Sequence, residues 1–104
     1  MNNIVLSLRF KDNDSVTYHI NKNELKTATI NGLINYLYNT KNYLKIKMDE
    51  LNIGLDNYGL FPREGPYGLI SNNSIPLNCS LDDNILRQLS NSVLYLLREG
   101  SSFY

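Results

Sequence analysis

The stretch 3-NIVLSLRFKDNDSVTYHI-20 alternates twice between apolar and polar residues, with a polar turn in the middle. Residues 3–10 place four apolar side chains on one face: Ile4, Leu6, Leu8 and Phe10. Residues 15–20 repeat the pattern with Val16, Tyr18 and Ile20. Period-two alternation is typical of a half-buried strand. Two such runs around a short Asx-rich turn predict an antiparallel hairpin.

The next segment changes to a helical period. Five residues recur at helical spacing: Ile30, Leu33, Ile34, Leu37 and Tyr38. This spacing predicts an amphipathic helix that starts at a cap on Thr27 or Thr29 and ends between Thr40 and Asn42. Gly32 inside it costs about 1 kcal/mol relative to Ala, which indicates close packing against the sheet.

Residues 43–53 fit two patterns, because Leu44, Met48 and Leu51 form a helical stripe while 44–48 also alternates like a strand. We favour a short second helix that Gly54 stops. Short strands are expected at 58–61 and 67–70, joined through the loop 62–66. A further helix is expected to start at a Ser80 cap with Asp83 at its third position.

The apolar run 93–98 suits a central strand. The expected fold is therefore one α+β domain over residues 1–98, with a mixed sheet of four to five strands packed on one main helix. Residues 99–104 are expected to form a flexible tail.

Composition excludes several classes of protein. The ten basic and ten acidic side chains cancel, which disfavours a nucleic-acid binder. Cys79 is the single cysteine, so it forms no intramolecular disulfide and no multi-thiolate metal site, and we expect a buried, inert thiol. Apolar runs are too short to span a membrane. A cytoplasmic protein, associated with cytoskeleton or membrane, is the expectation.

No residue pattern predicts an active site, a metal site or a cofactor site. His19 is the single histidine and is expected on the outer face of a strand. Asp12 with Asp14, and Asp82 with Asp83, lack the calcium loop that would follow a cation site, and turn or cap chemistry explains them. The loop 62–66 lacks the Gly-Lys signature of a phosphate cradle. We therefore expect a protein that is not an enzyme.

The segment 56-DNYGLFPREGPYGLISNNSIPL-77 resembles the ubiquitin-like lobes of talin- and kindlin-type heads. The matching positions are Tyr58, Gly59, Leu60, Phe61, Gly68, Leu69, Leu77 and Arg98. The resemblance implies a ubiquitin-like β-grasp roll, in which the last strand lies beside the first and parallel to it. The same roll also serves as the Ras-association fold. The chain is most similar to the amino-terminal GTPase-binding module of a social-amoeba formin, an actin-binding regulator of the actin cytoskeleton.

By that resemblance, the chain recruits or regulates such a regulator through a Rho- or Ras-type small GTPase. In Ras-association domains the second strand pairs with a strand of the GTPase, and nearby basic residues meet its acidic switch region. The residues in that zone here are Arg9, Lys11, His19, Lys22 and Lys26. The positive electrostatic field of these basic residues would be weakened by three acidic residues between them: Asp12, Asp14 and Glu24.

Two alternatives stay open. A peripheral membrane module would bind acidic phospholipids through basic residues interleaved with apolar ones, as talin-type lobes do; the candidates are Lys41, Tyr43, Lys45, Lys47 and Arg63. An intramolecular docking domain would use an exposed apolar patch against an adjacent domain of the parent chain. The candidates for that patch are Val5, Tyr95 and Leu97.

Overall fold

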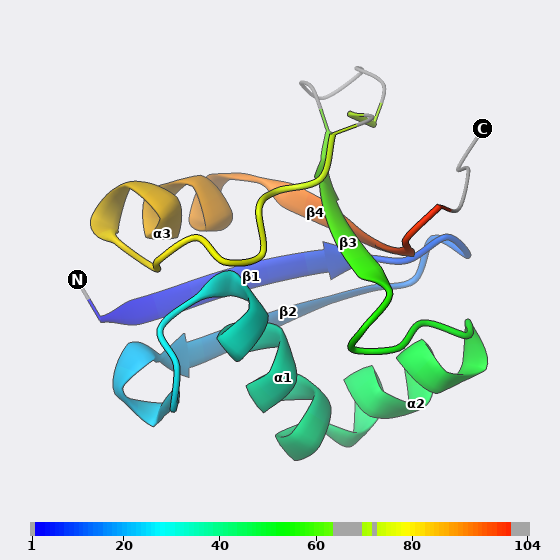
Figure 1. Ribbon diagram of the computed structural model, residues 1–104, viewed down its shortest axis with the longest axis horizontal. Helices are drawn as coiled ribbons and strands as arrows, with labels where there is room; N and C mark the ends of the chain where they lie inside the picture. The colour runs from blue at the N-terminus through cyan, green and yellow to red at the C-terminus, as the bar shows by residue number, and fades with distance from the viewer. Residues whose placement is uncertain (1, 64–69, 72, 101–104) are drawn as a thin grey trace.

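The computed structural model describes residues 2–63, 70–71 and 73–100. Within them the chain forms, in order, β1 (Asn3–Arg9), β2 (Ser15–Asn21), the 3₁₀ turn η1 (Lys22–Glu24), α1 (Ile30–Thr40), α2 (Asn42–Glu50), β3 (Tyr58–Pro62), α3 (Asp83–Asn91) and β4 (Val93–Arg98). In Figure 1 the sheet crosses the middle of the view, with α1 and α2 below it and α3 at the upper left.

The strands form a mixed sheet in the order β2-β1-β4-β3. β1 and β2 pair antiparallel over their whole length, from Asn3 opposite Asn21 to Arg9 opposite Ser15. β4 lies parallel to β1 and antiparallel to β3. The predicted α+β class, the hairpin and the central position of the last strand are confirmed. Most of the strand predicted at 67–70 lies outside the described residues. Of its four residues the structure describes only Ile70, which forms a β-bridge with Arg63.

The core lies between the inner face of the sheet and the helices. The inward residues of β1, Ile4, Leu6 and Leu8, are at most 1% exposed, as the alternation predicted. α1 contributes its buried stripe of Ile30, Leu33, Ile34 and Leu37. The residues that recur every second position on the strand and about every 3.6 positions on the helix therefore pack together in one apolar layer.

The start of α1 confirms the sequence prediction, whereas the role of Gly32 and the end of α2 differ from it. Thr29 caps α1, since its Oγ1 accepts a hydrogen bond from the Gly32 amide at 3.0 Å. A Cβ on Gly32 would lie 2.0 Å from the carbonyl oxygen of Thr27. The glycine is thus required by the chain just before the helix, and the expectation that it packs against the sheet was wrong. α2 forms as predicted, but it ends at Glu50, and Asn52 rather than Gly54 takes the left-handed conformation (φ 61°).

The start of α3 corrects another prediction. Its cap is Asp82, whose Oδ1 accepts a hydrogen bond from the Ile85 amide at 2.9 Å, and not Ser80. Ser80 instead bridges Thr29. This bridge ties the chain before α3 to the start of α1. The sheet is accordingly accompanied by three described helices rather than by one main helix, and none of them is long and apolar enough to span a bilayer.

Candidate functional site

The two edges of the sheet differ in what covers them. At the β3 edge, the Ser71 amide donates to the Pro62 carbonyl at 2.9 Å and the Ile75 amide donates to the Leu60 carbonyl at 2.8 Å. At the β2 edge, no residue within 2–63, 70–71 or 73–100 forms a strand or bridge on the side away from β1. The outer side of β2 is therefore an open edge.

The hydrogen-bond pattern identifies which backbone groups face that edge. Lys22 donates to the Asn2 carbonyl at 2.6 Å, and Phe10 donates to the Asp14 carbonyl at 2.9 Å, at the two ends of the β1–β2 ladder. Bonded pairs alternate in an antiparallel ladder, so the even-numbered residues of β2 bond to β1. The odd-numbered residues turn their amides and carbonyls outward.

Three of these outward residues make no competing backbone hydrogen bond to any residue that the structure describes. Asn21 is excluded, because its amide donates to Glu24 Oε2 at 3.3 Å. That leaves Ser15, Thr17 and His19, whose side chains are all exposed. The Thr17 hydroxyl also shares a hydrogen bond of 3.1 Å with the Ser7 hydroxyl on β1. From residue 15 to 20 the strand carries no proline and no fixed charge, although both are common devices for blocking an edge.

The predicted basic residues flank this edge and do not form one cluster. Arg9 lies opposite Ser15 at one end, half-buried, and its Nε is buried without a hydrogen-bond partner among the described residues. Lys22 follows the last residue of β2 at the other end. Ser15 and Asn21 are six residue steps apart along β2, or ~20 Å at ~3.4 Å per residue. His19 lies between the two ends and Lys11 lies in the turn.

The acidic residues of the β1–β2 turn pair with Lys47, one of the residues of the predicted lipid-binding site. Lys47 Nζ on α2 makes ion pairs with Asp12 and Asp14, and Lys47 is only 8% exposed. The hydrogen bond from Lys47 lowers the pKa of Asp12, and the two carboxylates raise the pKa of Lys47. The expectation that these acids oppose the basic edge is therefore only partly right, because Lys47 offsets one of their two charges.

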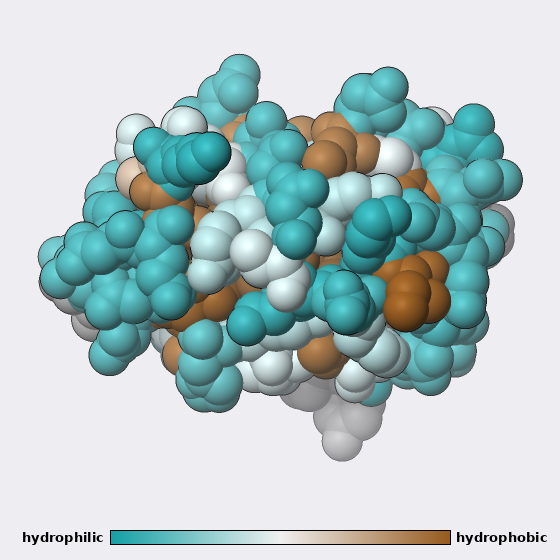
Figure 2. Space-filling model, turned by 90° about the horizontal axis from the view of Figure 1, so that it is seen from below, coloured by the Kyte–Doolittle hydropathy of each residue, from teal (hydrophilic) through white to brown (hydrophobic). Residues whose placement is uncertain are grey.

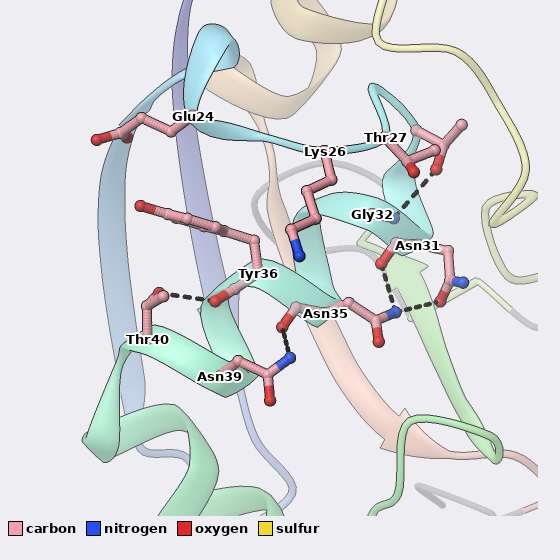
Figure 3. A pocket seen from close by; sticks show the side chains of 10 residues that line it. Glu24, Lys26, Thr27, Asn31, Gly32, Asn35, Tyr36, Asn39 and Thr40 are labelled. Carbon is pink, nitrogen blue, oxygen red and sulfur yellow. Dashed lines mark hydrogen bonds between the residues drawn. The ribbon is translucent and has the colours of Figure 1, made fainter.

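Lys26 lines a groove of about 520 Å³ between the loop that follows η1 and the solvent face of α1. In Figure 3 Lys26 reaches down between Tyr36 and Asn35, while the ring of Tyr36 extends from α1 below Glu24. The structure thus places Lys26 in this groove, apart from the row of outward backbone groups on β2. The remaining lining residues are Thr27, Thr29, Asn31, Gly32, Asn39 and Thr40.

The polar groups of the groove are largely bonded to the helix itself. Asn35 Nδ2 donates to the backbone carbonyl of Asn31 at 2.8 Å, and Asn39 Nδ2 donates to the backbone carbonyl of Asn35 at 2.9 Å. Asn31 Oδ1 accepts from the buried hydroxyl of Tyr58 at 2.8 Å, and burial raises the pKa of Tyr58 to about 12. Our sequence reasoning missed this groove; the four-residue spacing of the asparagines was its one visible signal.

Two of the five residues predicted to bind lipid, Lys45 and Lys47, already form ion pairs within the chain. Besides the buried Lys47, Lys45 binds Asp49 at 3.0 Å and lies 5.2 Å from the ring centroid of Tyr38. Lys41 and Tyr43 are exposed on the same helical region, whereas Arg63 lies beyond β3 in the bridge to Ile70. Figure 2 shows the lower face as mostly hydrophilic, with separate hydrophobic patches. The five residues therefore do not form one basic surface.

The predicted docking patch is wrong for two of its three residues. Tyr95 and Leu97 are each 4% exposed and form a small second cluster with Ile70, against which Phe61 packs. Val5, on β1, is half-buried and does not belong to this cluster. The neighbouring apolar residue that is exposed is Val93, at 44%. The outer face of β4 is thus covered where we expected it to be open.

No group of three or more metal-ligating side chains occurs in the part of the chain that the structure describes. Cys79 is half-buried against the core rather than fully buried. No protein-family model matches the chain, and no curated protein is significantly similar to it.

Proposed function

We propose that this chain is a non-catalytic binding module with a ubiquitin-like β-grasp fold. Its role is to recruit or regulate a formin-like cytoskeletal regulator by binding a Rho- or Ras-type small GTPase. The sheet order supports the fold: a β1–β2 hairpin is followed by a helix, and β4 lies parallel to β1 in the middle of the sheet. The link to formins rests on the sequence resemblance.

The open β2 edge is the observation that carries the proposal. An added strand of the partner bonds to the outward groups of Ser15, Thr17 and His19, which gives affinity without any pocket. The covered β3 edge supports the choice of side, because Ser71 and Ile75 already occupy it.

The charges around β2 supply steering. Arg9, on β1 opposite Ser15, and Lys22, just after β2, lie at opposite ends of the hairpin, so an acidic partner surface meets positive charge at both ends. Lys47 offsets part of the negative charge of Asp12 and Asp14 in the turn. Such complementarity acts mainly on the association rate and on the choice of partner.

The membrane and docking alternatives have weaker support. A lysine near acidic headgroups contributes about 1 kcal/mol, so a useful lipid site needs several together. Lys47 is buried and Lys45 is paired with Asp49. The docking patch is largely covered by the chain's own residues.

The test is a backbone amide NMR titration with a GTP-loaded Rac-type GTPase, with the GDP-loaded form as the control. We expect shifts concentrated in residues 15–22 with the GTP form alone. Shifts of equal size with the GDP form, or none at high concentration, would rule out an effector module for this GTPase. Vesicles of acidic lipid in place of the GTPase test the membrane alternative, which predicts shifts in residues 41–47.

Two charge reversals sharpen this titration. Lys22→Glu changes a charge at the end of the edge, while Lys41→Glu changes an exposed lysine that lies before α2. Electrostatic steering predicts that Lys22→Glu weakens GTPase binding by roughly tenfold at low salt. Lys41→Glu should leave it unchanged. Equal effects of both variants would mean that only net charge matters and that the edge is not the contact.

A further inference from the structure

The open part of β2 is self-complementary when two copies run antiparallel. Ser15, Thr17 and His19 each turn one amide and one carbonyl outward. When Thr17 of one copy lies opposite Thr17 of the other, Ser15 of each copy lies opposite His19 of its neighbour. Each of these pairs can then exchange two hydrogen bonds, as bonded pairs do in an antiparallel ladder.

Competing registers use a backbone group that is already bonded. Moving the two-fold axis from Thr17 to Tyr18 would place Ser15 opposite Asn21. The Asn21 amide already donates to Glu24 Oε2 at 3.3 Å, as part of the capping box of η1. The register centred on Thr17 uses all three open residues and disturbs no existing bond.

The charges at the two ends of β2 match in this register. Lys22 of one copy faces the turn of the other copy at the position of Asp12. Asp12, Asp14 and Lys47 together keep one net negative charge, because two carboxylates share one ammonium group. Lys22 makes no ion pair with any residue that the structure describes. Lys11 and Arg9 lie at the same end of the hairpin as Asp12, so it is the placement of the Lys22 ammonium opposite the Asp12 carboxylate, and not the net charge of the turn, that favours this orientation.

The side chains along the strand also allow a second copy to approach. On the inner face, Val16 lies opposite Tyr18 of the other copy, and both are half-buried in the protomer. Pairing would bury more of these two apolar side chains, which is favourable at about 25 cal/mol for each Å² covered. On the outer face the two Thr17 side chains meet, with no charge between them.

We propose that the chain forms a symmetric dimer in which β2 pairs antiparallel with β2 of a second copy, joining the two sheets into one. This proposal does not depend on the GTPase. Where both hold, dimerisation and GTPase binding exclude each other, because they use the same edge.

Two measurements on the unmodified chain test the dimer. Sedimentation equilibrium should show the mass rising from 12.0 kDa toward twice that value as concentration increases to about 1 mM. Amide hydrogen exchange locates the interface. Exchange at Thr17 and His19 should slow with concentration, while the amides of Val16 and Tyr18, bonded to β1, are protected throughout. A monomer at every concentration, or a dimer in which the Thr17 and His19 amides stay unprotected, would overturn the proposal.

Three variants separate the edge from other surfaces. Thr17→Lys places two ammonium groups face to face at the two-fold axis and should weaken the dimer by about tenfold or more. Asn3→Lys adds the same charge to an exposed residue at the end of β1, one strand inward, and should leave the dimer intact. Thr17→Val keeps the shape and should also dimerise. A Thr17→Lys variant that is folded by circular dichroism and dimerises normally would contradict the model of pairing. If the parent chain is monomeric, the dimer is ruled out, and the GTPase proposal is still tested separately by its own titration.

Discussion

At the β3 edge the chain covers its own backbone, whereas at the β2 edge it leaves the backbone exposed. The β3 edge receives hydrogen bonds from Ser71 and Ile75, and the ring of Phe61 lies over Gly59 beside it. The β2 edge presents Ser15, Thr17 and His19 with no strand beyond them in the described part of the chain. One edge of the sheet thus has its backbone groups bonded by the chain itself, and the other edge leaves its backbone hydrogen-bonding groups open.

The sequence explains this difference in part. β3 is apolar on both faces, so both faces need cover, and its first three residues are buried. The outward residues of β2 are small or polar, and water can satisfy them. Changes on the two sides should therefore have unequal effects on stability, which the following variants measure.

Leu60→Ala should have the largest effect. Leu60 is fully buried in β3, and truncation of a buried leucine typically costs about 2–5 kcal/mol, because it leaves a cavity. The free energy of unfolding in urea, followed by circular dichroism, measures the loss. A loss below about 1 kcal/mol would mean that the site collapses around the smaller side chain and that the β3 side is not tightly packed.

Gly59→Ala tests the cover on the β3 side more directly. A Cβ at this position would lie 2.8 Å from Cε2 of Phe61 and 3.5 Å from Cβ of Ser74. The Phe61 ring must move, and overpacking of this kind costs about 1–3 kcal/mol. We expect lower stability in urea together with faster amide exchange at Ile75, whose hydrogen bond to Leu60 helps to close the edge. Unchanged exchange at Ile75 would show that the ring moves without opening the edge.

Lys47→Met tests the ion pairs at the turn end of the β2 side, through their pH dependence. The folded-state pKa of Asp12 lies below its ordinary value of 3.8, because Lys47 donates a hydrogen bond to it. A lowered acid pKa contributes stability that is present above the ordinary value and is lost as the pH falls through the folded value. Lowering the pH from 6 to 3 takes it below about 3.9, the ordinary pKa of an aspartate. Over this interval the urea midpoint of the parent chain should therefore fall by more than the urea midpoint of Lys47→Met.

The control for this experiment is Lys41→Met, which changes an exposed lysine next to the same helix. Its difference from the parent chain should be the same at both pH values. A parallel decline of all three proteins would mean that Asp12 has the same pKa in the folded and unfolded states.

Thr17→Ala should have the smallest effect. It removes an exposed side chain and one hydrogen bond to Ser7, so a change within about 0.5 kcal/mol is expected. The same urea titration measures it. A loss comparable to that of Leu60→Ala would mean that the open edge is structural and would remove the contrast between the two sides.

Much of this architecture could be predicted from local patterns. The alternation around Leu6 and Leu8 and the helical stripe around Leu33 and Leu37 determine the hairpin and α1, because burial on one face leaves a period in the sequence. The central position of β4 could be predicted from its continuous apolar run. These features depend on neighbours within a few residues of the chain.

The errors concern contacts between distant segments. The sequence pattern predicts that Lys47 belongs to a basic stretch that faces solvent. In the structure Lys47 instead pairs with Asp12, 35 residues earlier in the chain. Tyr95 read as outward because the strand alternates, but Ile70 and Phe61 cover it. No local period encodes which segment covers an outer face, so neither the lipid residues nor the docking patch could be judged from the sequence alone.

The position of β4 affects how the sheet can fold while the chain is being synthesised. β4 is the link between the β1–β2 hairpin and β3, since it pairs with both β1 and β3. It also comes after the other three strands in chain order, so a nascent chain holds the hairpin and β3 without any strand to join them. Ser7 pairs with Val93, which is far from it in the sequence, so the contact order of the sheet is high. Sheets that depend on such distant pairings fold slowly. Until β4 arrives, β1 has an open edge of its own, and the nascent hairpin is then exposed to aggregation on both sides.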